Sequence, residues 1–295
     1  MITVVLGLVG ALVFGAADFL GGLSSKRISA VLTTAVSAVA GLVILGICAL
    51  VVPGEWSTAA AVWGALSGVT GALAVFLLYA CLAIGPMSIL SPLTAVVSAV
   101  VPVTWGFIGG ERLGPLAAAA IGLALVSVVL VGFVPEKGAV RPSAKGLIMA
   151  VASGALIGTF FILLDQTPDD SGLLPLVLNR GVNAAIMFTA FGIIVLVVRR
   201  GRARRAEPRP SVDARPAIRN GLALALACGA LDGAANAVIL VGLRAGDLSV
   251  MSVLIAMYPA GTILLAAVVL RERIAPLQWV GLALALAAAG ILAVA

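Results

Sequence analysis

The chain has 295 residues, of which 62% are hydrophobic and only 10% are charged. Soluble domains carry about 25% charged residues, so the composition excludes an ordinary soluble protein and indicates a membrane protein. The net charge of +6 does not indicate nucleic-acid binding, because the basic residues gather in short segments between apolar stretches. Histidine is absent, which removes the usual zinc sites, Ser–His catalytic pairs and histidine proton relays.

Ten apolar segments are long enough to cross a membrane, since a spanning helix needs about 20 mostly apolar residues. Lipid forbids open strands, whose backbone groups would lack hydrogen bonds, so we expect helices. The first segment exceeds the apolar core of a signal peptide, about 7–15 residues, and we predict that it is retained. The predicted spans are 2–23, 30–52, 58–82, 88–108, 115–134, 146–164, 173–198, 220–242, 249–270 and 276–294.

Small residues inside these spans indicate packing between helices. Gly64 and Gly68 lie on one face of the third span, where we expect close helix–helix contact. The cysteines Cys48, Cys81 and Cys228 lie in apolar segments without pairing or metal-ligand spacing, so we expect free thiols that pack as small hydrophobic residues.

A set of residues recurs without a gap at a spacing of 161 positions. Such internal similarity indicates two structural repeats. The first two spans of each half match weakly, at a shorter spacing. The matched pairs are Gly68 and Gly229, Gly85 and Gly246, Ser88 and Ser249, Ser91 and Ser252, Leu93 and Leu254, Glu111 and Glu272, Arg112 and Arg273, and Pro115 and Pro276.

The repeat predicts two five-helix halves, residues 1–135 and 146–295, joined by a polar linker at 136–145. Because five is odd, the second half enters the membrane from the opposite side. We therefore predict an all-α membrane protein of ten transmembrane helices, built as two inverted five-helix repeats. Inverted repeats place a binding site near the midplane, between halves that rock to give alternating access.

Three stretches of the sequence resemble the EamA family of the drug/metabolite transporter superfamily. They are Gly15-Ala-Ala-Asp18-Phe-Leu-Gly-Gly with Lys26-Arg27, and the paired elements Gly109-Gly-Glu111-Arg112-Leu-Gly-Pro115 and Leu270-Arg-Glu272-Arg273-Ile-Ala-Pro276. The resemblance implies a ten-helix carrier that exports amino acids, metabolites or drugs, with a cavity lined mainly by helices 1, 3, 4, 6, 8 and 9. Unlike many family members, this chain has no basic residue after its second span and a long arginine-rich link after its seventh.

Few ionisable groups lie inside the predicted spans, where a charge costs about 2.5–3.5 kcal/mol and marks a functional candidate. Asp232 lies near the middle of the eighth span, with Asn236 one turn later on the same face. Arg180 lies in the seventh span, with Asn183 on the same side. Asp232 either binds a cationic group or a proton, or forms a structural ion pair with Arg180.

Four further residues are candidates for the same site. Asp18 lies in the last turns of the first span, where it either gates the site or contacts Lys26 at the surface. Aromatic faces suit organic or cationic ligands, so Tyr79, Trp105 and Tyr258 either line a cavity or pack in the core. We also expect Pro259, in the middle of the ninth span, to kink its helix.

The sequence favours a secondary carrier for small molecules over other functions. It contains no phosphate-binding loop of the G-x-x-x-x-G-K-[ST] type, and its dispersed acidic groups form no nucleophile–base pair or metal cluster. We therefore predict no enzyme activity, no cofactor, no metal and no nucleic acid, with membrane lipids as surroundings and a monomer or homodimer. A flippase for lipid-linked substrates and an uptake carrier of the same fold are the alternatives.

The basic residues also predict an orientation in the inner (plasma) membrane. With ten spans, 15 of the 18 Lys and Arg residues fall on one face, including the basic segment 199–219, and the opposite face has only Arg112 and Arg244. Cytoplasmic loops carry the excess of Lys and Arg. We therefore predict that both termini lie outside the cytoplasm.

Overall fold

The structure is a computed structural model that describes residues 2–52, 54–84, 87–132, 143–205, 215–269 and 275–294. The regular elements of these residues are helices throughout, which confirms the predicted all-α class. The repeat residues Gly85, Glu272 and Arg273 and most of the 136–145 linker lie outside the described residues. The elements are α1 (Ile2–Ser25), α2 (Ala30–Val51), α3 (Thr58–Ile84), α4 (Met87–Ile108), α5 (Pro115–Gly132), α6 (Ala144–Asp165), the short 3-10 helix η1 (Asp169–Ser171), α7 (Leu174–Arg205), α8 (Arg215–Arg244), α9 (Leu248–Ile255), α10 (Tyr258–Val269) and α11 (Pro276–Val294).

Eight segments of the described chain are long and apolar enough to cross a membrane. They include α1 to α4 and α6 to α8, and the eighth is Leu248–Leu265, which runs through α9 into α10. Two shorter apolar helices, Pro115–Val131 and Pro276–Leu292, lie at the ends of the two halves. The structure therefore supports a multi-pass membrane protein.

The ninth predicted span is two helices with a break between them. α9 ends at Ile255, and α10 begins at Tyr258 after the turn at Ala256 and Met257. Pro259 has no N–H group, and its ring clashes with the carbonyl four residues earlier, which belongs to Ile255. The proline thus interrupts the helix one turn before its own position, as we expected.

Both ends of the arginine-rich segment 199–219 are helical, so the link between the two helices is shorter than we predicted. α7 continues to Arg205, and α8 already begins at Arg215. Only residues 206–214 of this segment lie outside the described chain. The basic residues at its two ends therefore extend two helices beyond their apolar spans.

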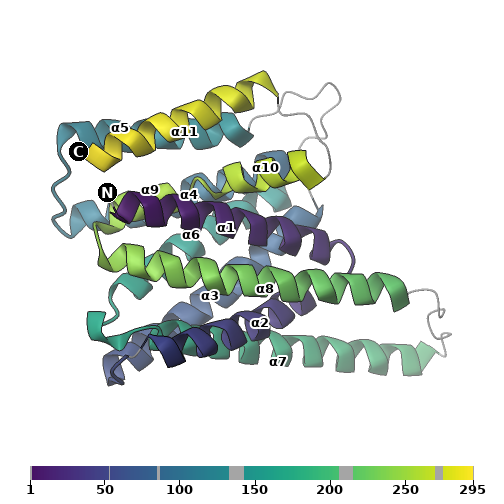
Figure 1. The fold of residues 1–295 in the computed structure, drawn as a ribbon. Coiled ribbons are helices and arrows are strands. Elements are labelled where there is room, and N and C mark those ends of the chain that lie inside the picture. Colours follow the sequence, from purple (N-terminus) through teal and green to yellow (C-terminus); the bar gives the residue numbers. More distant parts are fainter. Residues whose placement is uncertain are drawn as a thin grey trace.

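The helices lie roughly side by side, with both chain termini at one end of the bundle (Figure 1). We call this the terminal end, and we call the other end, where α1 meets α2, the loop end. α1 packs against α8 and α10, α3 packs against α6 and α7, and α2 packs against α7 and α8. α4 packs against α6 and α9, whereas α5 and α11 pair with each other at one edge.

Small residues allow the central helices to touch backbone to backbone. Gly64 and Gly68 lie on one face of α3 and contact the backbone of α7 at Pro175 and Asn179, which confirms their predicted packing role. Gly229 on α8 contacts the backbone of α2 at Ser37 in the same way. Such close approach is typical of helix association in lipid, where packing replaces the hydrophobic driving force.

We predict that Gly229→Ala lowers the melting temperature of the detergent-purified protein, because the new Cβ has no room against the Ser37 backbone. Overpacking of this kind costs about 1–3 kcal/mol. Gly192→Ala on α7 is the matched control, since nothing lies within 4 Å of its Cβ position. Fluorescence-detected thermal unfolding compares the two, and equal melting temperatures would contradict the observed contact.

Candidate functional site

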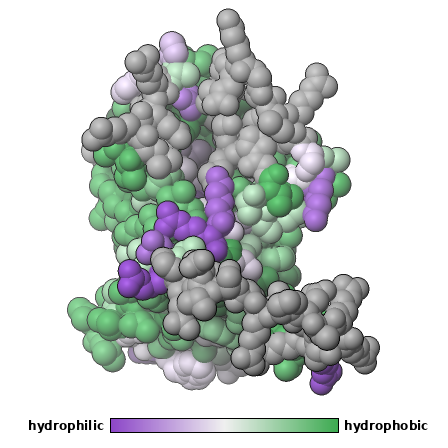
Figure 2. Space-filling view, turned by 90° about the vertical axis from the view of Figure 1, so that its right-hand side faces the viewer, coloured by the Kyte–Doolittle hydropathy of each residue, from purple (hydrophilic) through white to green (hydrophobic). Residues whose placement is uncertain are grey.

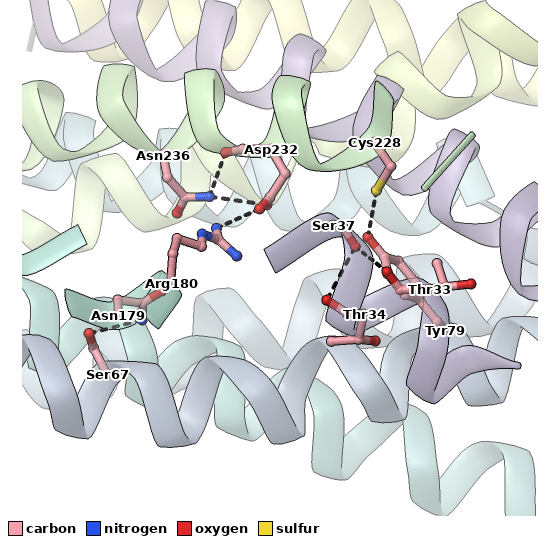
Figure 3. Close-up of polar contacts among 10 residues, drawn as sticks. All are labelled: Thr33, Thr34, Ser37, Ser67, Tyr79, Asn179, Arg180, Cys228, Asp232 and Asn236. Carbon is pink, nitrogen blue, oxygen red and sulfur yellow. Dashed lines mark hydrogen bonds and ion pairs between the residues drawn. The ribbon is translucent and has the colours of Figure 1, made fainter. Parts of the chain in front are cut away.

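An ion pair between α7 and α8 is the central feature of the site. Arg180 Nη2 lies 2.5 Å from Asp232 Oδ2, and the two side chains are 6% and 10% exposed (Figure 3). Two charges so deeply buried need each other, because either alone would be an uncompensated charge in a low-dielectric interior. Asp232 and Arg180 therefore form the ion pair that was one of our two alternatives for them. Both residues also line a cavity.

Amide side chains surround the ion pair. The Asn236 Nδ2 group donates to Asp232 Oδ1 at 3.1 Å and to the Asp232 carbonyl at 2.8 Å. Asn179, beside Arg180 on α7, donates to Ser67 Oγ of α3 at 3.0 Å. The Oδ1 atoms of Asn183 and Asn236 are buried and have no hydrogen-bond partner in the described part of the chain. Both atoms are therefore free to accept a hydrogen bond.

A narrow cavity of about 20 Å³ adjoins these groups, which is room for roughly one water molecule. It receives side chains from α1, α3, α6, α7 and α8, so both halves of the chain contribute to it. Two of its lining pairs, Gly71 with Asp232 and Val75 with Asn236, are related by the 161-residue spacing of the repeat. The lining residues are Phe14, Gly71, Ala74, Val75, Ile157, Phe160, Asn179, Arg180, Asp232 and Asn236.

Of the three predicted aromatic residues, Tyr258 lies next to the cavity, Tyr79 lies in another polar cluster, and Trp105 lies away from the cavity. Tyr258 is 1% exposed and meets Phe14 edge-on with ring centroids 5.5 Å apart, so it supports a lining residue from behind. Tyr79 is also buried but contacts a different polar cluster. Trp105 is 50% exposed and is not among the cavity residues.

Asp18 is buried, with only 5% of its surface exposed, and lies seven residues before the end of α1. No ion pair joins it to Lys26 or to another basic residue of the described chain. Its surface-contact alternative is therefore wrong. The sequence was misleading because Asp18 lies near the end of its predicted span, which suggested a position at the membrane surface. Its burial depends instead on the helices that pack around it.

A second polar cluster lies between α1, α2, α3 and α8, toward the loop end. The Tyr79 hydroxyl lies 3.0 Å from Cys228 Sγ, and Ser24 Oγ lies 3.0 Å from Thr33 Oγ1. Ser37 donates to the Thr33 carbonyl at 2.6 Å (Figure 3). Cys48, Cys81 and Cys228 are free thiols, as predicted, but Cys228 makes a polar contact that its apolar sequence context did not indicate.

Sequence reasoning missed two features. Phe14 and Phe160 line the cavity, yet nothing in an apolar span distinguishes them from packing residues. At the terminal end, Arg244 donates to Ser171 Oγ at 2.9 Å and to the Pro168 carbonyl at 3.1 Å, which ties α8 to the turn before α7. The only sequence signal for this contact was Arg244 itself, a basic residue at the end of the bundle where the loops are mostly acidic.

Comparisons with known proteins support a membrane transport fold. The model of the EamA-like transporter family matches residues 144–294. Among 29 matching chains of solved structures, one described only as the crystal structure of a protein is 19% identical, with a TM-score of 0.63. That match covers 96% of this chain and 95% of the other, and at this identity it shows similarity of fold alone. No curated protein matches the sequence.

We predict that Arg180→Met and Asp232→Asn each destabilise the protein by about 3–5 kcal/mol, because each leaves one buried charge without its partner. The double variant strands neither charge and should be less destabilised than the sum of the two. Thermal unfolding of the three purified variants measures this coupling. Additive losses would mean that the two side chains do not stabilise one another.

Proposed function

This chain belongs to the EamA-like transporter family, a family of membrane transporters in the drug/metabolite transporter superfamily, and on that premise we propose that it is a secondary carrier that exports small polar metabolites, such as amino acids, or drugs. The observation that carries the proposal is the cavity between the two halves, with a charged pair and the free amide oxygen of Asn236 at its wall. In alternating access, the two halves rock around such a site and expose it first to one side of the membrane and then to the other.

The packing of the helices supports the proposed inverted repeat. If the halves are exchanged, α1 corresponds to α6, α2 to α7 and α3 to α8. The contact of α1 with α8 then corresponds to that of α6 with α3, and the contact of α2 with α8 to that of α7 with α3. The repeat partners Gly68 and Gly229 obey the same exchange, since one contacts α7 and the other contacts α2. A two-fold axis in the membrane plane explains these reciprocal contacts.

The charges of the cavity favour a substrate without net charge. Arg180 and Asp232 balance one another, so a bound anion or cation would leave the site with an uncompensated charge. A zwitterion offers a carboxylate to the guanidinium and an ammonium group to the carboxylate. A neutral polar solute instead donates to the free Oδ1 atom of Asn236, which lines the cavity. Phe14 and Phe160 supply apolar walls beside these polar groups.

A carrier mechanism needs no ATP hydrolysis in this chain, and the sequence contains no phosphate-binding loop. The energy comes from an ion gradient or from the gradient of the substrate itself. A carrier binds its substrate in every cycle, so its flux saturates, whereas a channel usually requires oligomeric symmetry or a ring of selectivity residues.

We predict that zwitterionic or neutral polar solutes raise the melting temperature of the purified protein, because a ligand stabilises the state that it binds. In proteoliposomes the same solute should show saturable counterflow. Asn236→Leu removes one free acceptor and should weaken apparent affinity about five- to 150-fold, since a lost hydrogen bond in a buried site costs about 1–3 kcal/mol.

Trp105→Phe, outside the cavity, is the matched control and should keep wild-type affinity. Flux that rises linearly with solute concentration would contradict a carrier. Movement of a lipid reporter without solute flux would instead identify a flippase, and concentration of solute on the cytoplasmic side would identify an uptake carrier.

The charges at the two ends of the bundle support the orientation that we propose, with both termini outside the cytoplasm. The loop end shows strongly hydrophilic side chains among apolar ones (Figure 2). Its exposed basic residues lie directly after α1 and at the described ends of α6, α7 and α8, whereas acidic residues predominate at the terminal end. The exposed basic residues at the loop end are Lys26, Arg27, Lys145, Arg200 and Arg219. The charged residues at the terminal end are Glu55, Glu111, Arg112, Asp165, Asp169, Asp170, Arg244 and Asp247.

We predict that alkaline phosphatase fused after Ala295 is active and that green fluorescent protein fused there is dark, because the C-terminus lies outside the cytoplasm. The reporters should show the reverse when inserted after Lys26, at the loop end. Fluorescent green fluorescent protein at the C-terminus would overturn the orientation and leave the carrier function untouched.

A further inference from the structure

Asp18 occupies a distinct position between the cavity and the second polar cluster. Phe14, one turn earlier on α1, lines the cavity, and Gly21, one turn later, lies directly against the Tyr79 ring. The carboxyl group therefore lies beside α3 and α8 in the interior of the bundle. Its Oδ2 atom is buried and has no hydrogen-bond partner among residues that the structure describes.

The groups that face Asp18 carry no compensating positive charge. Helix α3 supplies Tyr79 and Cys81, α8 supplies Cys228 and Asp232, and α10 supplies Tyr258, all close enough to interact with it electrostatically. The other helices packed on α1, which are α2, α9 and α11, contain no charged residue. Four of the five neighbours are neutral phenols or thiols, and the fifth is a second carboxylate.

The buried charges of the described chain do not balance if both carboxylates are ionised. Asp18 and Asp232 are negative, and Arg180 is the one buried cation of that set. Arg180 already pairs with Asp232, and Asn236 donates to the same carboxylate. An ionised Asp18 would thus be an uncompensated charge in the interior, which is too costly to persist without a partner.

We propose that Asp18 is the proton-binding residue of this carrier and holds one proton while the Arg180–Asp232 pair is intact, an assignment that rests on the proposed transport function for its role. Asp232, whose position near the middle of its span made it the first candidate for proton binding, is instead committed to Arg180. One proton therefore balances two carboxylates and one guanidinium in each molecule.

The neighbours of Asp18 favour a proton over a metal ion as its ligand. Hard cations bind several oxygen ligands at once, mostly carboxylates, carbonyls and waters. The neighbours of Asp18 are instead two thiols, two phenols and the Asp232 carboxylate that Arg180 already binds, and the described residues contain no group of three or more metal-ligating side chains. A proton needs only the carboxyl oxygen itself.

The second polar cluster offers a route between Asp18 and the loop end. Tyr79 lies beside Gly21 and contacts Cys228, and Ser24 contacts both Thr33 Oγ1 at 3.0 Å and the Gly221 carbonyl at 2.9 Å. Hydroxyl groups both donate and accept, so these groups can pass a proton in either direction where water or side-chain rotation joins the Tyr79–Cys228 contact to the Ser24–Thr33 contact. The row ends beside Arg27 at the loop end.

Coupling follows from competition for a single guanidinium. A substrate carboxylate that binds Arg180 weakens the ion pair between Arg180 and Asp232. The carboxylate also adds one negative charge to those that the guanidinium and the proton must balance. A zwitterion adds no net charge, so its binding alone does not release the proton from Asp18. A solute with a net positive charge replaces the proton, because it supplies the charge that the proton supplied.

The test is infrared spectroscopy of the purified protein at neutral pH, because a protonated carboxyl has a carbonyl stretch that a carboxylate lacks. The wild type should show one buried carboxylic acid and Asp18→Asn should show none. Arg180→Met removes the shared cation and should about double the signal, since both carboxylates must then be neutral. Asp170→Asn, at an exposed position, is the control and should leave the band unchanged.

Asp18→Asn is isosteric with the neutral acid, so it should melt close to the wild type, and this keeps the test independent of folding. A carboxylic-acid band that survives in Asp18→Asn would overturn the proposal and return the proton to Asp232. In proteoliposomes Asp18→Asn should keep counterflow but lose accumulation driven by a pH gradient. Retained pH-driven accumulation would also overturn it, whereas absence of transport in every variant would refute the carrier function and leave the infrared result intact.

Discussion

The buried ion pair between Arg180 and Asp232 is the constraint on which the other polar features depend. It joins α7 to α8 within one half, and it lies at a cavity to which α1, α3 and α6 also contribute. Because lipid and apolar side chains surround the bundle, every charge inside it needs a partner nearby. The position of one guanidinium therefore decides which of the two buried carboxylates can remain ionised.

The polar groups at the cavity do not follow the 161-residue repeat of the sequence. Asp232 and Asn236 correspond by the 161-residue spacing to Gly71 and Val75, which face the same cavity without a polar side chain. Tyr79 likewise corresponds to Leu240. A binding site that is polar on one side and apolar on the other can orient an asymmetric solute, whereas a symmetric site could not. The scaffold and the site are thus separate features of the chain.

Small residues allow the helices around the cavity to pack closely. Gly68 and Gly229 bring α3 onto α7 and α8 onto α2. The second polar cluster lies one turn of α8 from the ion pair, because Cys228 precedes Asp232 by four residues. Pro259 breaks the ninth span between α9 and α10, next to Tyr258, which supports Phe14 at the cavity wall. The break in the helix thus lies beside a residue that supports the cavity wall.

The sequence by itself determined the helical class, the approximate limits of the spans and the spaced glycines, because lipid imposes a minimum apolar length and forbids other backbone forms. It also identified Arg180, Asp232 and Asn236, since polar residues are rare inside such spans. Only the tertiary structure decided which groups meet. It paired Asp232 with Arg180, buried Asp18 away from Lys26, and left Trp105 half exposed. Contacts between helices depend on rotation and packing across the bundle, and hydrophobic spans with almost uniform apolar faces carry little information about either.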